Sequence, residues 1–131
     1  MRAAGQFHVK LSPQSSETES DATVLGRLTI DKQFEGDLVA TSKGQMLAAG
    51  TQTKGSAGYV AIEKVTGKLN DREGSFHLQH SGIMNRGAPS LSITVVPDSG
   101  SDGFVGLSGS MQIEIADGKH SYVFDYEVSN S

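Results

Sequence analysis

The sequence predicts an all-β protein, an eight-stranded antiparallel up-and-down β-barrel, and three observations support this fold class. Apolar and polar residues alternate with a period of two in eight stretches, as half-buried strands require. No stretch keeps apolar residues at helical spacing over two turns. Turns rich in Gly, Asp and Asn join the stretches one after the next, which favours a meander. Closing the meander into a barrel would also remove its exposed strand edges.

The length and charge of the chain limit its class. The 131 residues suit a single domain, 1–131, with one core. The net charge is -4 and no basic stripe is present, so we expect no nucleic-acid partner. Since no long apolar run and no secretory signal are visible, we expect neither membrane insertion nor export. The absence of cysteine excludes disulfides and favours a cytoplasmic location.

The first three strands are expected in the N-terminal third of the chain. Residues 3–11 alternate apolar and polar positions and predict the first strand. Residues 12–23 are polar and acidic without periodicity, which predicts a mobile loop. Residues 24–34 and 38–47 alternate again, and the Glu35-Gly36-Asp37 turn signal between them predicts a hairpin.

The remaining strands follow the same pattern. Asn70-Asp71 and Asp117-Gly118 are hairpin turn signals, and Pro89 suits the entry of a strand, where its missing N–H costs least. The five further strands are expected at residues 59–66, 74–84, 91–96, 105–116 and 120–128.

The predicted strand faces bring several polar residues into one barrel lumen. An apolar cavity with a few convergent polar groups is the usual form of a small-molecule site. We therefore expect a small hydrophobic or amphipathic ligand to bind in the lumen. The candidate ligand-binding residues are Lys32, Met46, Tyr59, Glu63, His80, Tyr122 and Tyr126.

Each candidate also has a structural interpretation. Lys32 can reach solvent along its aliphatic stem, and Glu63 can pair with Lys32 or with a backbone group. His80 can be a satisfied interior histidine, and the tyrosines can simply fill the barrel. The frame of residues 59–65 is open as well, because a slip by one residue would turn Glu63 outward and place Ile62 inside.

Glu63 and His80 are the candidate catalytic residues, since buried carboxylate and imidazole groups can transfer protons when their environment shifts their pKa values. The sequence has no nucleophile elbow and no phosphate-binding loop, and it implies no cofactor. A metal site is not expected. His77 and His80 are three residues apart, which places them on opposite faces of a strand.

Four stretches carry a family resemblance: GRLTIDKQFEGDLVATSKGQML (26–47), GSAGYVAIEKVTGKLNDREGSFHLQHSG (55–82), VVPDSGSDGFVGLSG (95–109) and DGKHSYVFDY (117–126). They resemble a family of small bacterial proteins of unknown function. Members of that family resemble the allene oxide cyclase barrel, an eight-stranded relative of the lipocalin (calycin) shape. The resemblance implies the barrel, a lumen open to a small apolar molecule and a homo-oligomer. The plant cyclase acts on an unstable epoxide of fatty-acid origin, and none of its pocket residues carries over.

Three functions remain. The favoured one is a binding barrel for a small hydrophobic or amphipathic molecule. The alternative is a cofactor-free isomerase, cyclase or hydrolase that uses Glu63, His80 and the tyrosines of the lumen. The third is a structural, oligomeric barrel with a filled core, because side chains can fill an eight-stranded barrel. If the lumen is filled by side chains, both ligand-based functions fail and this last function stands. The side chains that would fill it are Phe34, Phe76, Met111 and Phe124.

Overall fold

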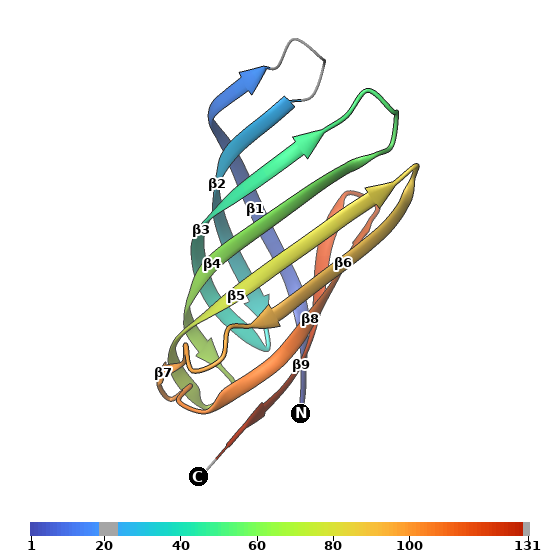
Figure 1. Ribbon diagram of the computed structural model, residues 1–131. Coiled ribbons are helices and arrows are strands. Elements are labelled where there is room, and N and C mark those ends of the chain that lie inside the picture. Colours follow the sequence, from blue (N-terminus) through green and yellow to red (C-terminus); the bar gives the residue numbers. More distant parts are fainter. Residues whose placement is uncertain (19–23, 130–131) are drawn as a thin grey trace.

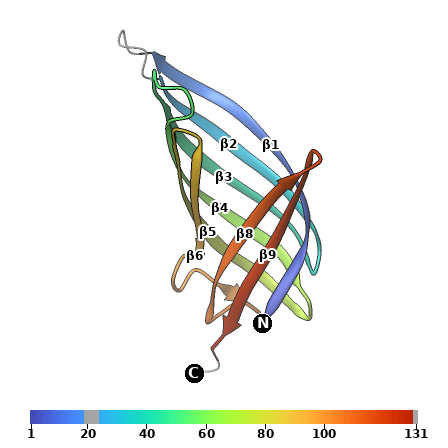
Figure 2. The same cartoon turned by 90° about the vertical axis from the view of Figure 1, so that its right-hand side faces the viewer.

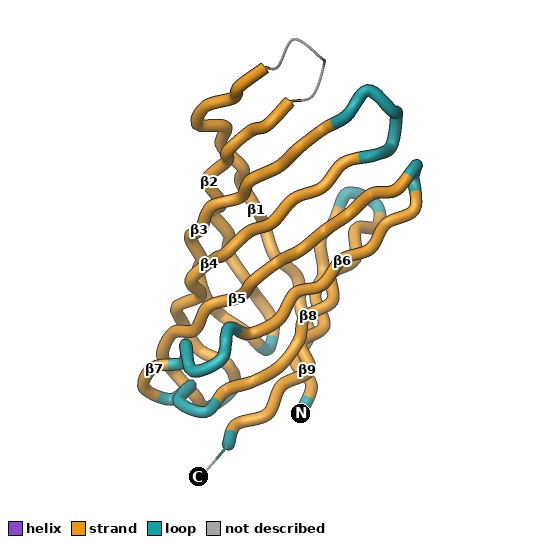
Figure 3. Tube along the Cα trace, viewed as in Figure 1, coloured by secondary structure: helices purple, strands orange, loops and turns teal. Residues whose placement is uncertain are grey.

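A computed structural model of the chain describes the backbone of residues 1–18 and 24–129, and the side chains of these residues apart from 14–18, 24 and 25. Over these residues the chain forms strands and turns (Figure 3). Within the same part of the chain there is no helix that could span a membrane. The strands are β1 (Arg2–Thr18), β2 (Val24–Gly36), β3 (Leu38–Gly50), β4 (Ala57–Leu69), β5 (Arg72–Asn85), β6 (Ala88–Val95), β7 (Ser101–Asp102), β8 (Leu107–Ala116) and β9 (Lys119–Val128).

The strands close into a barrel, as the sequence predicts. Hydrogen-bonded neighbours follow the order β4-β3-β2-β1-β9-β8-β6-β5, and β4 also pairs with β5, which completes the ring (Figure 1). All these pairings are antiparallel. The two-residue strand β7 pairs with Gly74 and Ser75 of β5, on the same edge of β5 that pairs with β6. It lies between the strands expected at residues 91–96 and 105–116. Closure leaves the eight long strands as a single wall around one core.

Strand β1 is longer than its sequence pattern indicates. The predicted loop 12–23 begins later than expected, because β1 continues to Thr18 by pairing with β2. A register shift between Pro13 and Ser15 explains why the alternation is lost there, since a bulge changes the face of the following residues. Backbone hydrogen bonds to β2 therefore extend the strand through a segment whose sequence has no apolar face. Residues 19–23 of the predicted loop lie outside the described residues.

The wall of the barrel is uneven in height. Strand β1 pairs with β9 from Arg2 to Phe7, whereas it pairs with β2 from Gly5 to Thr18. The pairing of β6 with β8 is Thr94 with Ser110. Strands β8 and β9 are shorter than β1 to β5, and the tips of the other strands project beyond the β8–β9 hairpin (Figure 2). We call this projecting end the open end, and the end with both termini the closed end.

The closed end is filled by aromatic side chains. The Phe76 and Phe124 rings stack with centroids 5.8 Å apart, and Phe34 meets Tyr122 edge to face at 5.5 Å. Together with Met111 these side chains are almost completely buried. Each fully buried side chain of this kind contributes about 1.5–3 kcal/mol. The lumen is therefore packed at this end and leaves no room for a ligand beside these rings.

Two candidate ligand-binding tyrosines belong to this packed end. The hydroxyl of Tyr122 donates to the carbonyl oxygen of Glu35 at 2.9 Å and accepts from the amide of Leu38 at 2.9 Å. The hydroxyl of Tyr126 accepts a hydrogen bond from the Asn70 side chain at 3.0 Å. Both hydroxyl groups tie neighbouring turns to the barrel.

Candidate functional site

A buried polar cluster lies next to the aromatic core and consists of Lys32, Ser42, Glu63 and His80. These residues come from four neighbouring strands, β2 to β5, and each occupies an inward position of its strand. The exposed fractions are 6%, 1%, 0% and 4%. Lys32 lies directly opposite Ser42, and His80 is opposite Ala61, the residue two positions before Glu63. The register of four strands thus gathers the cluster.

Glu63 is at the centre of the cluster, and both oxygens of its carboxylate have hydrogen-bond partners. The Lys32 ammonium donates to Oε2 at 2.8 Å, and the Ser42 hydroxyl donates to Oε1 at 2.7 Å. Nε2 of His80 lies 2.5 Å from Oε2. Within the described part of the chain no buried side-chain nitrogen or oxygen lacks a partner. The structural interpretation that Glu63 pairs with Lys32 is confirmed.

The charges in the cluster keep Glu63 ionised. Burial is the largest single influence and raises the pKa of this carboxyl group, but the hydrogen bonds and charges of His80 and Lys32 together outweigh it. Together they lower the pKa of Glu63 to about 2. The Lys32 ammonium also lies 5.2 Å from the Phe7 ring centroid and 5.7 Å from that of Phe34, within reach of cation–π attraction. Glu63 is therefore an anion at neutral pH.

Tyr59 extends the cluster toward the open end. Its hydroxyl lies 3.4 Å from Nδ1 of His80, so Tyr59, His80 and Glu63 form a chain of polar contacts. Burial raises the pKa of the Tyr59 hydroxyl, and the negative charge of Glu63 adds to the rise. The phenol therefore stays protonated and acts as a hydrogen-bond donor.

Two inward-facing glycines make room for these side chains. A Cβ atom on Gly44 would lie 2.6 Å from the Cα atom of Glu63, which is directly opposite it. A Cβ atom on Gly82 would lie 2.3 Å from Cε1 of Tyr59, again its opposite residue. The sequence reasoning missed Gly44, Gly82 and Ser42 as site residues. The register of the predicted hairpins would have found them, because each lies opposite a candidate or beside one.

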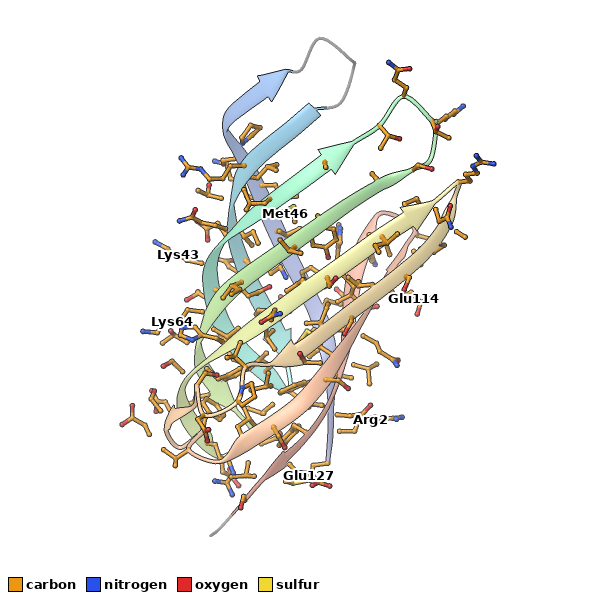
Figure 4. The ribbon with its side chains drawn as sticks, viewed as in Figure 1. Arg2, Lys43, Met46, Lys64, Glu114 and Glu127 are labelled. Atoms are coloured by element: carbon orange, nitrogen blue, oxygen red, sulfur yellow. The ribbon has the colours of Figure 1, made fainter. Side chains whose placement is uncertain are left out.

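Beyond the cluster, the inward strand faces carry apolar side chains that stay accessible. Leu11 of β1 is 43% exposed and Leu91 of β6 is 42% exposed, although both share a face with buried core residues. Because the β8–β9 hairpin is short, Ile115 near its tip is 64% exposed. The open end is thus an apolar mouth above a polar floor. Half-buried side chains that complete its wall are Val9, Leu28, Met46, Tyr59 and Ile113, and Figure 4 labels Met46 on β3.

The structure brings four of the sequence candidates into contact and separates the others. Lys32, Glu63, His80 and Tyr59 form one connected group, and Met46 is on the inward face of β3 nearer the open end. The open question of the β4 frame is resolved, because Glu63 is inside and Ile62 is outside with 53% exposure. The two closed-end tyrosines lie apart from this group, and His77 is on the face of β5 opposite to His80.

Comparisons with known proteins agree with this architecture. A family model described as "Protein of unknown function (DUF3224)" matches residues 3–126. A crystal structure of a protein with unknown function from the DUF3224 family of Shewanella oneidensis MR-1 superimposes with a TM-score of 0.96. The two sequences are 48% identical, and the match covers 100% of this chain and 98% of that chain. No curated protein matches. The resemblance to a bacterial family of unknown function is thus confirmed.

Proposed function

The chain belongs to the DUF3224 family of proteins of unknown function, and from the geometry of its barrel we propose that it binds a small amphipathic molecule at the open end. One observation carries the proposal. Inward apolar side chains remain accessible next to a buried and fully bonded cluster of Lys32, Glu63 and His80. A buried ion pair stabilises a folded protein less than well-packed apolar residues of similar volume. Its position at the base of the apolar mouth therefore supports a role in ligand binding.

The chemistry of the mouth indicates how such a ligand would lie. The hydrocarbon part would pack against Leu28, Met46 and Leu91, with a gain of about 0.8 kcal/mol for each buried methylene group. The polar end would accept a hydrogen bond from the protonated hydroxyl of Tyr59. His80 and Glu63 hold that tyrosine in place from below. The ligand class is therefore an apolar molecule that ends in a carbonyl, carboxylate or hydroxyl oxygen.

The direct test is native mass spectrometry of the protein purified from a bacterial host, followed by titration with lauric acid as a defined probe. We expect a retained small molecule or saturable binding of the probe. Met46→Asp, which places a negative charge among the apolar side chains of the mouth, should abolish binding. Val39→Asp on the outer face of the same strand, where Val39 is 61% exposed, is the matched control and should leave it unchanged. Equal binding by both variants would contradict the proposal.

A cofactor-free acid–base enzyme is the second candidate function. The chain from Glu63 through His80 to Tyr59 supports it, since a carboxylate that orients an imidazole prepares the other ring nitrogen for proton transfer. The test is to incubate a retained ligand with the protein and to follow isomerisation by NMR. Glu63→Gln should stop turnover while binding persists. A ligand that is recovered unchanged after prolonged incubation would exclude this function for that ligand.

A structural barrel is the third candidate, and the packed closed end favours it. Phe34, Phe76, Met111 and Phe124 are all buried there, as this function requires. The ligand proposal is therefore confined to the open end, where Leu11 and Leu91 stay accessible. The structural barrel becomes the preferred function if neither a retained molecule nor probe binding is found.

Two further expectations stay proposals. The allene oxide cyclase-like character of the barrel rests on the sequence resemblance, and the cytoplasmic location rests on the absence of cysteine. Cell fractionation followed by immunoblotting tests the second.

A further inference from the structure

Strand β1 has a long edge at the open end that no strand covers. Its pairing with β9 ends at Phe7, whereas its pairing with β2 continues to Thr18. Within the described part of the chain, no other strand pairs with β1 on the side of β9. In Figure 2 the upper part of β1 extends past the tip of the β8–β9 hairpin. Such an edge presents unpaired backbone N–H and C=O groups to a further strand.

The backbone groups that face this edge follow from the hydrogen bonds lower in the strand. Met1 exchanges two hydrogen bonds with Tyr126 of β9, both 2.9 Å long. In a strand the backbone groups of every second residue face the same side, and no register shift occurs before the bulge that follows Pro13. Val9 and Leu11 therefore direct their N–H and C=O groups to the uncovered edge. Pro13 is the next residue of this set and has no N–H, so it ends the row of donors.

Incompletely buried apolar side chains accompany the uncovered edge on its inward face. Val9 is half-buried and Leu11 is 43% exposed. Ile115 at the tip of β8 is 64% exposed, and it lies in the row that continues through His120 to Phe7 of β1. A strand in the position that a longer β9 would take packs every second side chain against Val9, Leu11 and Ile115. The edge therefore offers hydrogen bonds and apolar contacts to the same strand, as sites of strand addition do.

A second copy of β1 does not match this edge. Opposite residues of an antiparallel pair point to the same face, so two copies can pair only in registers that differ by whole pleats. In one register Lys10 is opposite its own copy, and like charges directly opposite each other are destabilising. The next register places Pro13 opposite Val9, whose carbonyl oxygen then has no donor. The register in the other direction requires Phe7, which β9 already covers.

We propose that the uncovered edge of β1 binds an extended peptide segment of another protein, which adds a strand antiparallel to β1. Only a peptide backbone offers both donors and acceptors at the repeat of alternate strand residues, roughly 7 Å. The residues opposite Val9 and Leu11 have apolar side chains that point inward, and the residues between them are polar and face solvent beside Lys10. Because Pro13 ends the row of donors, the site takes about five residues. The proposal goes beyond the small ligand of the open end and does not rest on it.

The experiment is an NMR titration of the full chain with the pentapeptide acetyl-Thr-Val-Thr-Val-Thr-amide, combined with amide hydrogen exchange. In the free protein the amides of Val9 and Leu11 should exchange quickly, whereas those of His8 and Lys10, which face β2, should be protected. Saturation with the peptide should slow the exchange of Val9 and Leu11 by at least about tenfold and leave His8 and Lys10 unchanged.

Two methylated peptides with the same side chains test the backbone bonds. A peptide residue whose side chain points inward opposite Val9 or Leu11 also directs its N–H to β1. N-methylation of both valines should therefore abolish binding. N-methylation of the central threonine, whose N–H faces away from β1, is the matched control and should leave binding in place.

A matched pair of variants locates the site on β1. Leu11→Pro removes an N–H of the uncovered edge and should weaken peptide binding by about tenfold or more. Leu91→Pro makes the same change on β6 and should leave binding unchanged. The amide of Leu91 faces away from β5, because the amide of Val96 donates to the carbonyl oxygen of His77 on β5 and alternate residues share a side. Circular dichroism confirms that both variants are folded.

Four results overturn the proposal. The first is protection of the Val9 and Leu11 amides in the free protein, and protection that rises with protein concentration identifies a second copy as the occupant. The second is the absence of saturable binding at millimolar peptide. The third is equal binding of the two methylated peptides, and the fourth is a loss of binding in Leu91→Pro with none in Leu11→Pro. Lauric acid binding is measured separately, so each of these results leaves the proposed small-ligand function standing.

Discussion

Nε2 of His80 lies 2.5 Å from Oε2 of Glu63, although the two residues are diagonal and not opposite in the β4–β5 register. The residue opposite His80 is Ala61, whose short side chain leaves space for the imidazole to lean toward the carboxylate. This contact connects the buried Lys32 on one side with the half-buried Tyr59 on the other. The stability of the barrel and the chemistry of its mouth therefore depend on the same carboxylate.

Replacing Glu63 with Gln should destabilise the barrel by about 3–5 kcal/mol, because the Lys32 ammonium then stays buried without its counter-ion. Urea unfolding at neutral pH measures this free energy. Glu35→Gln is the matched control, since the Glu35 side chain is 59% exposed, and it should change stability by less than about 0.5 kcal/mol. The double variant Lys32→Met/Glu63→Gln should lose less than the sum of its single changes, and full additivity would contradict the pairing.

The stability of the barrel should fall in acid because of Glu63. Its folded pKa of about 2 is below the ordinary 4.5, so the unfolded chain binds this proton more readily. The contribution is complete above pH 4.5 and is lost as the pH falls toward 2. A lowering of this size corresponds to about 3 kcal/mol. Unfolding free energies of Glu63→Gln and the unchanged protein, measured across this window, should converge as the pH falls, and a constant difference would refute the assignment.

Gly82→Ala should move the ring of Tyr59 away from His80. The added methyl group would lie 2.3 Å from Cε1 of Tyr59, so the ring or the strand must shift. We expect a loss of about 1–3 kcal/mol in urea unfolding, together with a shift of the His80 ring resonances in NMR. The same substitution should cost much less in a Tyr59→Ala background. Gly26→Ala, which would contact nothing within 4 Å, is the control and should be close to neutral.

Tyr122→Phe should destabilise the closed end by about 1–3 kcal/mol, because it leaves the buried amide of Leu38 without its partner. Tyr126→Phe removes a hydroxyl that is bonded to the partly buried Asn70 amide, so the loss should be smaller. Thermal unfolding followed by circular dichroism compares the two variants. A larger loss for Tyr126→Phe would contradict the role assigned to the Tyr122 hydroxyl.

The sequence pattern predicts the barrel and the face of most site residues, but it does not predict height along the barrel. Lys32, Tyr122 and Tyr126 all have inward positions, yet the two tyrosines are at the packed end. Alternation of apolar and polar residues shows which face a side chain is on, but it does not show at which height of the barrel the strand begins to pair. The frame of β4 stayed open because both of its faces are largely apolar. Burial of Val65 and Leu69 on one face, with Ile62 left outside, decides it.

The end of β1 could not be predicted from the alternation of apolar and polar residues either. The bulge between Pro13 and Ser15 disrupts the period while the backbone pairing continues. The buried cluster was partly predictable, since Lys32, Glu63 and His80 fall on inward faces. Ser42 follows only when the β2–β3 register is fixed.

The short β8–β9 hairpin gives this architecture an adjustable depth. Its turn, Asp117-Gly118, has φ values of 54° and 75°, and a side chain on Gly118 would contact nothing within 4 Å. Extra residues inserted there would lengthen two strands of the wall and leave the buried cluster untouched. Under the proposed binding function, the length of this one hairpin would set the size of molecule that the open end can enclose.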